Sequence, residues 1–292
     1  MAHKAGFVNI VGNPNVGKST LMNLFVGERL SIITNKSQTT RHRILGIING
    51  EDFQIIFSDT PGVVKPHYKL QESMLKFSNS ALEDADVLLY VTDVVETKEK
   101  NIEFIEKVNK TDAHQIVVIN KIDLTDQKKL EELVDYWKQQ LPKAEIYPIS
   151  ALHKFNADLL FKRIVSLLPD SPPYFEKDAL TDRPERFFIS EIIREKIFER
   201  YKEEVPYSTE VNIEQFKEDK KIIHINAVIL VERDSQKGII IGNQGKALKG
   251  VGTEARKDIE KFLGKQVFLQ IFVKVQKDWR NNDNQLKQFG YE

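Results

Sequence analysis

A chain of 292 residues is long enough for two domains of ordinary size, each with its own hydrophobic core. Its 43 Lys and Arg residues balance 43 Asp and Glu residues, so any affinity for nucleic acid has to come from a local basic surface. The absence of cysteine excludes disulfides, thiolate nucleophiles and cysteine-ligated zinc, and it favours a reducing compartment. Neither a signal peptide nor an apolar run of roughly 20 residues is recognisable, so we expect a cytoplasmic protein.

The first 168 residues alternate short β-branched runs with longer amphipathic stretches, which is typical of βαβ units. Apolar residues spaced by three and four positions predict helices that pack on a sheet. The expected strands are Phe7–Val11, Ile44–Ile48, Phe53–Phe57, Val87–Val91, Gln115–Ile119 and Ile146–Ile149, and the expected helices are Asn101–Val108, Lys129–Leu141 and Leu159–Leu168. Residues 1–168 therefore predict an α/β domain with a mainly parallel sheet and helices on both faces.

Residues 169–186 interrupt this pattern with four prolines and several turn residues. We interpret them as a linker, and the alternative is a long surface loop within one domain. A new pattern begins directly afterwards, with a helix, two strands, a glycine-containing turn, a helix and a strand. These elements are expected at Phe187–Lys202, Glu210–Phe216, Lys221–Val231, Lys246–Leu263 and Gln266–Val275. Residues 187–292 therefore predict a second α/β domain.

A glycine-rich segment follows the first expected strand and opens a helix, which is the context that a phosphate-binding loop requires. Backbone N–H groups of such a loop point at phosphate oxygens, and the following helix adds its positive N-terminal end. Lys18 would reach the β- and γ-phosphates, and the Ser19 hydroxyl would ligate Mg²⁺. The expected nucleotide-binding residues of this segment are Gly12, Asn13, Pro14, Asn15, Val16, Gly17, Lys18, Ser19 and Thr20.

Three further motifs follow later strands, in the order that guanine-nucleotide chemistry needs. Asp59 would act through Mg²⁺ at a strand end, and the N–H of Gly62 would approach the γ-phosphate. The Asp123 carboxylate would accept both the N1–H and the 2-amino group of guanine, a donor pair that adenine lacks. Further contacts are expected from Thr60, Pro61, Asn120, Lys121, Ser150 and Ala151. Each motif alone is explained as a turn or helix cap, but their joint order favours GTP over ATP.

Two segments are expected to be mobile and to respond to the γ-phosphate. In residues 38–43, a hydroxyl would join Mg²⁺ only when that phosphate is present. Thr40 is the preferred ligand and Thr39 the fallback, and a polar surface loop is the alternative. Residues 59–72 form the second segment. The expected Mg²⁺ ligands are Ser19, Thr40 and Asp59, and the expected catalytic residues are Lys18, Thr40, Asp59 and Gly62.

Hydrolysis is expected to be slow without help from another group. Ras-like enzymes position the attacking water with a Gln directly after the Asp-x-x-Gly motif, and this chain has Val63 there. An apolar side chain can neither orient water nor accept its proton. We expect His42 and His153 to be surface residues rather than general bases.

Residues 237–280 carry ten Lys and Arg against four Asp and Glu, a net charge of +6 in a chain whose total is zero. Within them, Gly242 and Gly245 form a Gly-x-x-Gly segment that would let a sugar-phosphate backbone approach, beside an apolar groove for about four unpaired bases. The alternative is an ordinary solvated helix face. The expected RNA-binding residues are Ile241, Gly242, Asn243, Gln244, Gly245, Lys246, Lys249, Arg256 and Lys274.

The nucleotide motifs resemble those of the translation-factor class of GTPases. In the C-terminal pattern, the Gly-x-x-Gly segment is expected between two helices, and the resulting order of helix, two strands, two helices and strand resembles a type II KH domain. Nearly the whole chain is similar to the Era family of bacterial ribosome-assembly GTPases, which joins a TrmE-Era-EngA-type GTPase domain to a KH domain. The detailed matches are Gly12–Ser19, Gln38–His42, Pro206–Thr209, Val273–Val275 and Asp278–Arg280. The missing Gln at Val63 is usual in that family.

This resemblance implies GTP-dependent binding to the 3′ end of 16S rRNA and a role late in 30S subunit assembly. It also implies association of part of the protein with the inner face of the membrane. The implied cofactors are Mg²⁺ and K⁺: in GTPases that share this loop, the Asn at position 15 is associated with a bound K⁺ that can replace an arginine finger. Asn15 could equally stabilise its own loop. We expect a monomer, with RNA binding controlled by the bound nucleotide.

Two other functions remain open at this point. The KH fold could be a docking surface of a GTPase that acts on a tRNA or a protein client. The chain could also be an RNA-binding protein whose nucleotide site is only structural. Trp279 would either stack on a base or lie buried under the last strand.

Overall fold

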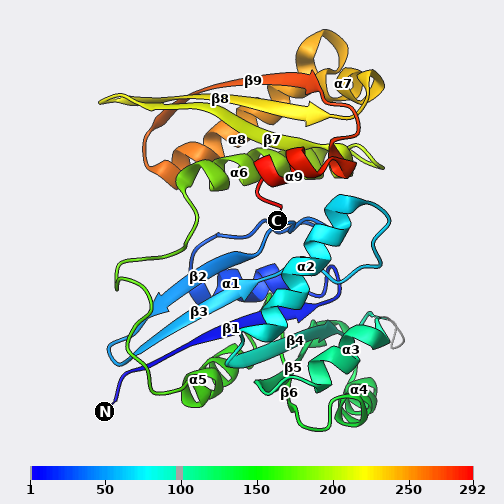
Figure 1. Cartoon of the computed structure of the whole chain (residues 1–292), viewed down its shortest axis with the longest axis vertical. Coiled ribbons are helices and arrows are strands. Elements are labelled where there is room, and N and C mark those ends of the chain that lie inside the picture. Colours follow the sequence, from blue (N-terminus) through cyan, green and yellow to red (C-terminus); the bar gives the residue numbers. More distant parts are fainter. Residues whose placement is uncertain (1, 97–100, 292) are drawn as a thin grey trace. The chain divides into compact units, whose positions relative to one another are not determined.

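The computed structural model describes residues 2–96 and 101–291. The chain divides into two compact units (Figure 1): Met1–His67 with Gln71–Asp182, and Tyr68–Leu70 with Arg183–Glu292. Among the residues described, none of the helices is long and apolar enough to cross a membrane.

The first unit is built on a six-stranded sheet in which only one pair of neighbours is antiparallel. The strands are β1 (Lys4–Gly12), β2 (Ile44–Asn49), β3 (Phe53–Asp59), β4 (Val87–Asp93), β5 (His114–Asn120) and β6 (Glu145–Pro148). Their order is β2-β3-β1-β4-β5-β6, and β2 runs antiparallel to β3. All six expected strands are present, and the mainly parallel sheet is confirmed. The parallel strands bring their carboxyl ends, and the loops that follow them, to one edge of the sheet.

Helices cover both faces of this sheet, as predicted. They are α1 (Lys18–Val26), α2 (Lys69–Glu83), α3 (Ile102–Asn109), α4 (Gln127–Gln140) and α5 (Ala157–Leu167). On one face, α3 and α4 contribute Phe104 and Trp137 to a buried apolar cluster that also contains a residue of α2. On the other face, Phe25 of α1 stacks on Phe57 of β3 and lies 5.6 Å from the ring of Phe161 in α5. Helix α2 was not expected, and its first turn falls in the segment predicted to be mobile.

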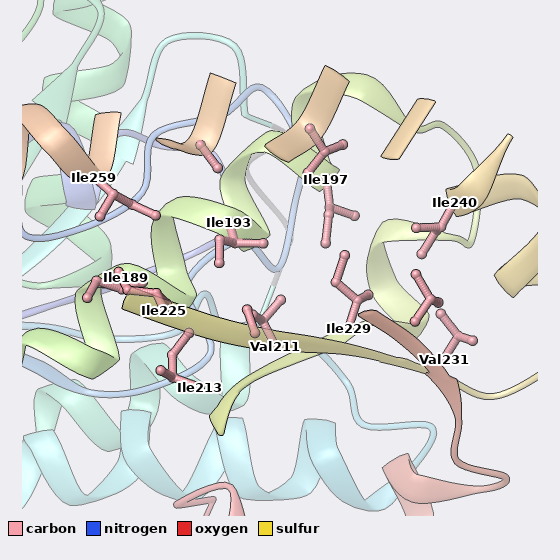
Figure 2. Packing of buried hydrophobic residues seen from close by; sticks show 14 of the residues in the cluster. Ile189, Ile193, Ile197, Val211, Ile213, Ile225, Ile229, Val231, Ile240 and Ile259 are labelled. Carbon is pink, nitrogen blue, oxygen red and sulfur yellow. The ribbon is translucent and has the colours of Figure 1, made fainter. Parts of the chain in front are cut away.

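The second unit contains a three-stranded mixed sheet with helices packed on it. Its elements are α6 (Glu185–Arg200), β7 (Glu210–Glu218), β8 (Ile222–Val231), α7 (Asp234–Ile241), α8 (Lys246–Leu263), β9 (Gln266–Val275) and α9 (Asp283–Gln288). Strand β8 lies in the middle, antiparallel to β7 and parallel to β9. The order helix, two strands, two helices, strand confirms the predicted arrangement. Figure 2 shows the shared core, to which Ile193 of α6, Ile229 of β8 and Ile259 of α8 contribute.

Polar side chains are also buried in the second unit. The guanidinium of Arg194 makes two hydrogen bonds to the Glu191 carboxylate, at 2.7 and 2.6 Å, and its side chain is 1% exposed. Trp279 is fully buried and donates its indole N–H to the carbonyl oxygen of Ser208 at 3.1 Å. Because the Trp279 ring is enclosed, the alternative in which it stacks on a base is wrong, and the alternative in which it is buried is confirmed.

Residues 169–182 lie along the first unit, and we call them the connector strap. The Ile47 amide of β2 donates to the carbonyl oxygen of Leu180 at 2.8 Å, and the Thr181 hydroxyl donates to the carbonyl oxygen of Leu45 at 2.7 Å. The strap therefore pairs with the outer side of β2, the edge strand of the sheet and the strand that follows residues 38–43.

A buried amide anchors the middle of the connector strap, where Lys177 of the strap also donates to the carbonyl oxygen of Glu51 at 3.1 Å. Gln54 of β3 is fully buried, and its Oε1 accepts hydrogen bonds from the backbone N–H groups of Tyr174 and Phe175 at 2.7 and 3.0 Å. Its Nε2 donates to the carbonyl oxygen of Phe175 at 2.9 Å and to Oδ1 of Asn49 at 2.7 Å. All four hydrogen bonds are made by the Gln54 side chain, so they are lost together when it is removed.

Replacing Gln54 with Ala leaves two strap N–H groups without an acceptor. We expect the free energy of unfolding of the first unit to fall by about 2–3 kcal/mol, with faster hydrogen exchange at the Ile47 amide. Native-state hydrogen exchange measures both effects. The matched control is Gln139→Ala on the exposed side of α4, which should change neither. Unchanged exchange at Ile47 in Gln54→Ala would show that the strap is held by other contacts.

Candidate nucleotide and RNA sites

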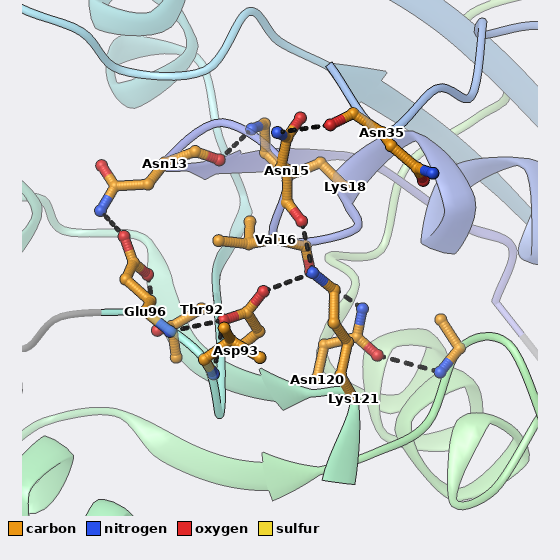
Figure 3. Close-up of polar contacts among 12 residues, drawn as sticks. Asn13, Asn15, Val16, Lys18, Asn35, Thr92, Asp93, Glu96, Asn120 and Lys121 are labelled. Atoms are coloured by element: carbon orange, nitrogen blue, oxygen red, sulfur yellow. Dashed lines mark hydrogen bonds and ion pairs between the residues drawn. The ribbon is translucent and has the colours of Figure 1, made fainter. Parts of the chain in front are cut away.

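The glycine-rich loop between β1 and α1 packs tightly against the adjacent strands. Gly17 has a φ of +98°, and a Cβ there would lie 2.2 Å from Nδ2 of Asn120. Asn120 Nδ2 also donates to the carbonyl oxygen of Val16 at 2.9 Å, while the Ala151 N–H donates to Asn120 Oδ1 at 3.0 Å (Figure 3). One side chain at the end of β5 therefore ties the phosphate-binding loop to the loop that follows β6.

Lys18 is buried at the base of this loop. Its ammonium group donates to the carbonyl oxygens of Gly12 and Asn13, at 3.1 and 2.7 Å. Burial lowers the pKa of Lys18 to about 8, although the negative charges of Asp59 and Glu96 oppose this shift. A phosphate beside Lys18 would stabilise the charged form that burial disfavours.

Three side-chain oxygens meet beside Lys18, as the sequence predicted. The Ser19 hydroxyl donates to Oδ2 of Asp59 at 2.6 Å, and Oγ1 of Thr40 lies 3.0 Å from Oγ of Ser19. Burial raises the pKa of Asp59, an effect that the Lys18 charge and the Ser19 hydrogen bond oppose. The second oxygen of Asp59, Oδ1, is buried and has no hydrogen-bond partner of good geometry among the described residues.

This donor set fits a hard cation such as Mg²⁺, because all its ligands are oxygens and one buried carboxylate oxygen has no hydrogen bond of good geometry among the described residues. Within residues 2–96 and 101–291, no cluster of three or more His, Asp or Glu side chains could hold a metal. Mg²⁺ would therefore take its remaining ligands from phosphate oxygens and water.

The structure separates the two threonines that the sequence left as alternatives. Thr39 is held within its own loop, where its hydroxyl donates to the carbonyl oxygen of Lys36 and lies 2.7 Å from the Thr34 hydroxyl. Only Thr40 of the pair is placed next to Ser19. The geometry therefore favours Thr40 over Thr39 as the metal ligand.

The Asp-x-x-Gly segment packs directly on the glycine-rich loop. A Cβ on Gly62 would lie 2.7 Å from backbone and ring atoms of Pro14. Val63 donates its N–H to the carbonyl oxygen of Gly12 at 3.1 Å, and its side chain belongs to the buried apolar cluster. Val63 therefore faces the core. The expectation that His42 lies at the surface is wrong, because the ring packs beside Phe77 and is 6% exposed.

The proposed guanine-binding side chains lie at the ends of β5 and β6. Ser150 donates its hydroxyl to Oδ1 of Asp123 at 2.5 Å, and this bond is the main reason why the pKa of Asp123 is lowered. Lys121 extends across the glycine-rich loop, and its ammonium group donates to the carbonyl oxygen of Asn15 at 2.6 Å. His153 is exposed, as expected, with Nε2 3.8 Å from the Asp123 carboxylate.

Two acidic residues near the glycine-rich loop, Asp93 and Glu96, were not predicted from the sequence to belong to the site. Asp93, at the end of β4, accepts from the Lys121 ammonium group at 2.5 Å and caps the following turn through the N–H groups of Val95 and Glu96. Glu96 accepts from the side-chain amide of Asn13 (Figure 3). The end of a parallel strand is the signal that could have identified Asp93, since it also identified Asp59.

Asn15 connects the glycine-rich loop with the loop before β2. It has a φ of +65°, and its Nδ2 donates to the carbonyl oxygen of Asn35 at 3.2 Å. A cavity of 340 Å³ lies between these loops and is lined by Lys18, Ser19 and Thr40, among others. Its position fits the phosphates of a nucleotide, whose charge the loop N–H groups and Lys18 would neutralise.

The Gly-x-x-Gly segment forms the turn between α7 and α8. Gly242 and Gly245 have φ values of +69° and +73°, and Gln244 is also left-handed at +50°. A Cβ on Gly242 would lie 2.6 Å from Cβ of Ala247, whereas a Cβ on Gly245 would meet nothing within 4 Å. The Gly245 side of the turn is therefore open to a ligand.

The basic residues expected to bind RNA fall into two groups. Lys246, Lys249 and Arg256 are exposed along α8. Arg256 is paired with Glu260 at 3.1 Å, and it lies about 15 Å along the helix from Lys246. Lys274 is on the exposed side of β9 and is paired with Glu214 at 2.7 Å. The odd-numbered residues of β9 face the helices, so Lys274 lies on the other face of the sheet.

Comparisons with known proteins match both units. Residues 7–121 match a family described as a 50S ribosome-binding GTPase, and residues 204–280 match the KH domain. The GTPase Era of Thermoanaerobacter sp. (strain X514) is 46% identical over 294 residues, which cover 100% of this chain and 97% of the relative. The GTPase Era of Alkaliphilus metalliredigens is 45% identical over 295 residues, with full coverage of both chains.

Two solved structures agree with the chain over 99% of both lengths. One is Era in complex with MgGDPNP and nucleotides 1506–1542 of 16S ribosomal RNA, with a TM-score of 0.95 and 41% identity. The other is an Aquifex aeolicus Era variant bound to GDP·AlF4⁻, with a TM-score of 0.94 and 42% identity. The chain belongs to the Era family of GTPases, in which a P-loop GTPase domain precedes a KH domain.

Proposed function

We propose that this GTPase is a nucleotide-controlled switch that binds the 3′ end of 16S rRNA through its KH domain and assists assembly of the 30S subunit. The observation that carries the proposal is the presence of two different phosphate-binding designs in one chain. The first unit lines one cavity with Lys18, Ser19 and Thr40, and Asp59 is hydrogen-bonded to Ser19 beside it. The second unit presents a Gly-x-x-Gly turn beside a basic helix. The solved Era complex with MgGDPNP and RNA supports both halves.

The geometry supports the following proposed roles within the GTPase site. Residues 12–20 would hold the phosphates, with Lys18 at the β- and γ-phosphates. Ser19, Thr40 and Asp59 would hold Mg²⁺, which would neutralise charge that develops on the phosphates. The N–H of Gly62 would contact the γ-phosphate. Because Val63 faces the core, intrinsic hydrolysis would be slow.

Guanine would be recognised by the residues at the ends of β5 and β6. The Asp123 carboxylate would accept both donors of the base, and the N–H of Ala151 would contact its oxygen. The GTPase domain would comprise residues 1–168 and the KH domain residues 187–292, with residues 169–186 as a linker of which 169–182 pack on the first unit.

The KH domain would bind single-stranded RNA along the turn at 241–246 and the basic face of α8. Lys246, Lys249 and Arg256 would meet phosphates there, whereas Lys274, on the other face of the sheet, would contact RNA only beyond this surface. GTP would favour the RNA-binding state and hydrolysis would release the RNA. We also propose a monomer in the cytoplasm, part of it associated with the inner face of the membrane. Co-sedimentation with anionic vesicles tests the membrane association, and light scattering tests whether the protein is a monomer.

Replacing Asp123 with Asn should change the base that is bound. The Asn oxygen still accepts from Ser150, so the loop keeps its shape, but its amide N–H₂ faces the 2-amino group of guanine. We expect GTP affinity to fall roughly a hundredfold and xanthosine triphosphate, which has an oxygen at that position, to bind better than GTP. Fluorescence titration with both nucleotides checks this exchange. An equal loss for both would assign Asp123 a structural role.

RNA binding should depend on the charge placed at Gly245. Gly245→Asp puts a carboxylate in the open side of the turn, and Asp tolerates a positive φ better than most residues. We expect at least tenfold weaker binding to an oligonucleotide of the 16S rRNA 3′ end, with Gly245→Asn as the neutral control of the same shape. Titrations with GTP analogue and with GDP test the coupling. If Gly245→Asp binds like Gly245→Asn, the KH domain is a docking surface for another partner.

Turnover should be faster in K⁺ than in Na⁺ if Asn15 helps to bind a K⁺ ion. We expect roughly a tenfold difference in kcat between the two salts in the wild type. Asn15→Gly removes the side chain and retains the left-handed backbone, so it should abolish the difference while nucleotide affinity stays within a few fold. Equal rates in both salts would reject the K⁺ role. Absence of GTP turnover even with RNA present would indicate that the nucleotide site is only structural.

A further inference from the structure

One side-chain hydrogen bond joins the two segments that were predicted to be mobile. Gln71 donates its Nε2 to Oε1 of Gln38 at 2.9 Å. Gln38 opens the segment 38–43, and Gln71 lies in the first turn of α2, within the segment 59–72. Gln71 belongs to none of the motifs that identify the nucleotide site, and no role was predicted for the Gln38 side chain.

The side chain of Gln71 is buried and uses both ends of its amide in hydrogen bonds. Its side chain is 5% exposed, and its Oε1 accepts the backbone N–H of His67 at 2.8 Å. The amide therefore uses its acceptor to hold the start of α2 and its donor to hold Gln38. A buried amide that loses one of these partners leaves a polar group unsatisfied, at a cost of about 1–3 kcal/mol.

Gln38 occupies a backbone conformation that a residue with a side chain seldom adopts. Its φ is +56°, which costs on the order of 1 kcal/mol and persists only where surrounding contacts hold it. Gln38 lines the 340 Å³ phosphate cavity and also a neighbouring cavity of 650 Å³, to which Gln71 and Val63 belong. It is therefore placed where the two segments meet beside the nucleotide.

The segment that contains Gln38 is closed over the phosphate-binding loop in this structure. Thr40 lies 3.0 Å from Ser19, and Asn15 donates to the carbonyl oxygen of Asn35. A γ-phosphate and Mg²⁺ would favour this arrangement, because it brings Thr40 to the metal. The bond between Gln38 and Gln71 thus occurs together with the conformation that GTP would select.

We propose that Gln38 and Gln71 are positioning residues for GTP hydrolysis, which act by clasping the two segments together in the closed arrangement. The clasp rests on the proposed nucleotide switch and deepens it. It raises the preference for GTP over GDP, because only GTP carries the γ-phosphate that holds Thr40 and Gly62 from both segments. It also keeps Thr40 in place during hydrolysis, to which Val63, an apolar residue that faces the core, supplies no polar group.

The chemistry of the amide pair allows a sharp test. An amide both donates and accepts, whereas a carboxylate only accepts. In Gln38→Glu, the Gln71 amide still donates; in Gln71→Glu, the Gln38 amide can rotate to donate, and the carboxylate still accepts from His67. The double variant leaves two facing carboxylates with no donor between them. Each single variant therefore keeps the clasp and the double variant breaks it.

The experiment compares wild type, both single variants and the double variant in full-length protein. Affinities for a GTP analogue and for GDP are measured, together with single-turnover hydrolysis. We expect each single variant to lower the affinity ratio only through the repulsion between one added charge and the phosphates. The double variant should lower the ratio by more than the two single effects combined, about tenfold in all, and should slow hydrolysis. GDP affinity should stay near the wild-type value, which also shows that the double variant is folded.

The matched control is Gln127→Glu. Gln127 donates to Glu131 at 2.8 Å on the exposed side of α4, so the variant creates a similar pair of carboxylates away from the nucleotide. It should alter neither the ratio nor hydrolysis. A wild-type ratio in the double variant, or single variants as impaired as the double, would overturn the clasp. Failure of the wild type to prefer GTP or to hydrolyse it would instead refute the underlying switch.

Discussion

The buried side-chain amide of Asn120 connects the loops that follow β1, β5 and β6. It donates to the Val16 carbonyl and accepts from the Ala151 N–H, while Gly17 approaches too closely for any side chain. The phosphate-binding loop and the loops that follow β5 and β6 are therefore held in fixed relative positions. Such preorganisation reduces the entropy lost on binding, and it explains why motifs far apart in the sequence act as one site.

The nucleotide site holds charges that the fold alone does not favour. Burial lowers the pKa of Lys18 to about 8 and raises that of Asp59, so each ion is less stable there than in water. Phosphates would stabilise the ammonium group and Mg²⁺ would stabilise the carboxylate. These buried charges lower the free energy of unfolding of the GTPase domain and raise its affinity for phosphates and Mg²⁺, as is common where a site binds charged ligands.

Strong periodic patterns and motif positions could be predicted from the sequence, and single side-chain contacts could not. The helix Lys246–Leu263 and the strand Gln266–Val275 have the predicted bounds, because glycine and apolar spacing mark both ends. Helix α2 was missed because its start lies in a segment assigned to loop motion. The choice between Thr39 and Thr40, the burial of His42 and the role of Asp93 depend on neighbours distant in sequence, which composition and spacing do not encode.

The connector strap has a consequence beyond joining two domains. An exposed edge strand offers unpaired N–H and C=O groups to the edges of other molecules, and proteins must block such pairing to stay dispersed. Strand β2 is an edge of this kind, and the strap covers it through hydrogen bonds of Leu180 and Thr181. Gln54 anchors the preceding part of the strap at Tyr174. A GTPase domain cut at residue 168 would lose this cover. The segment that looks like a spacer therefore also protects the isolated sheet from self-association.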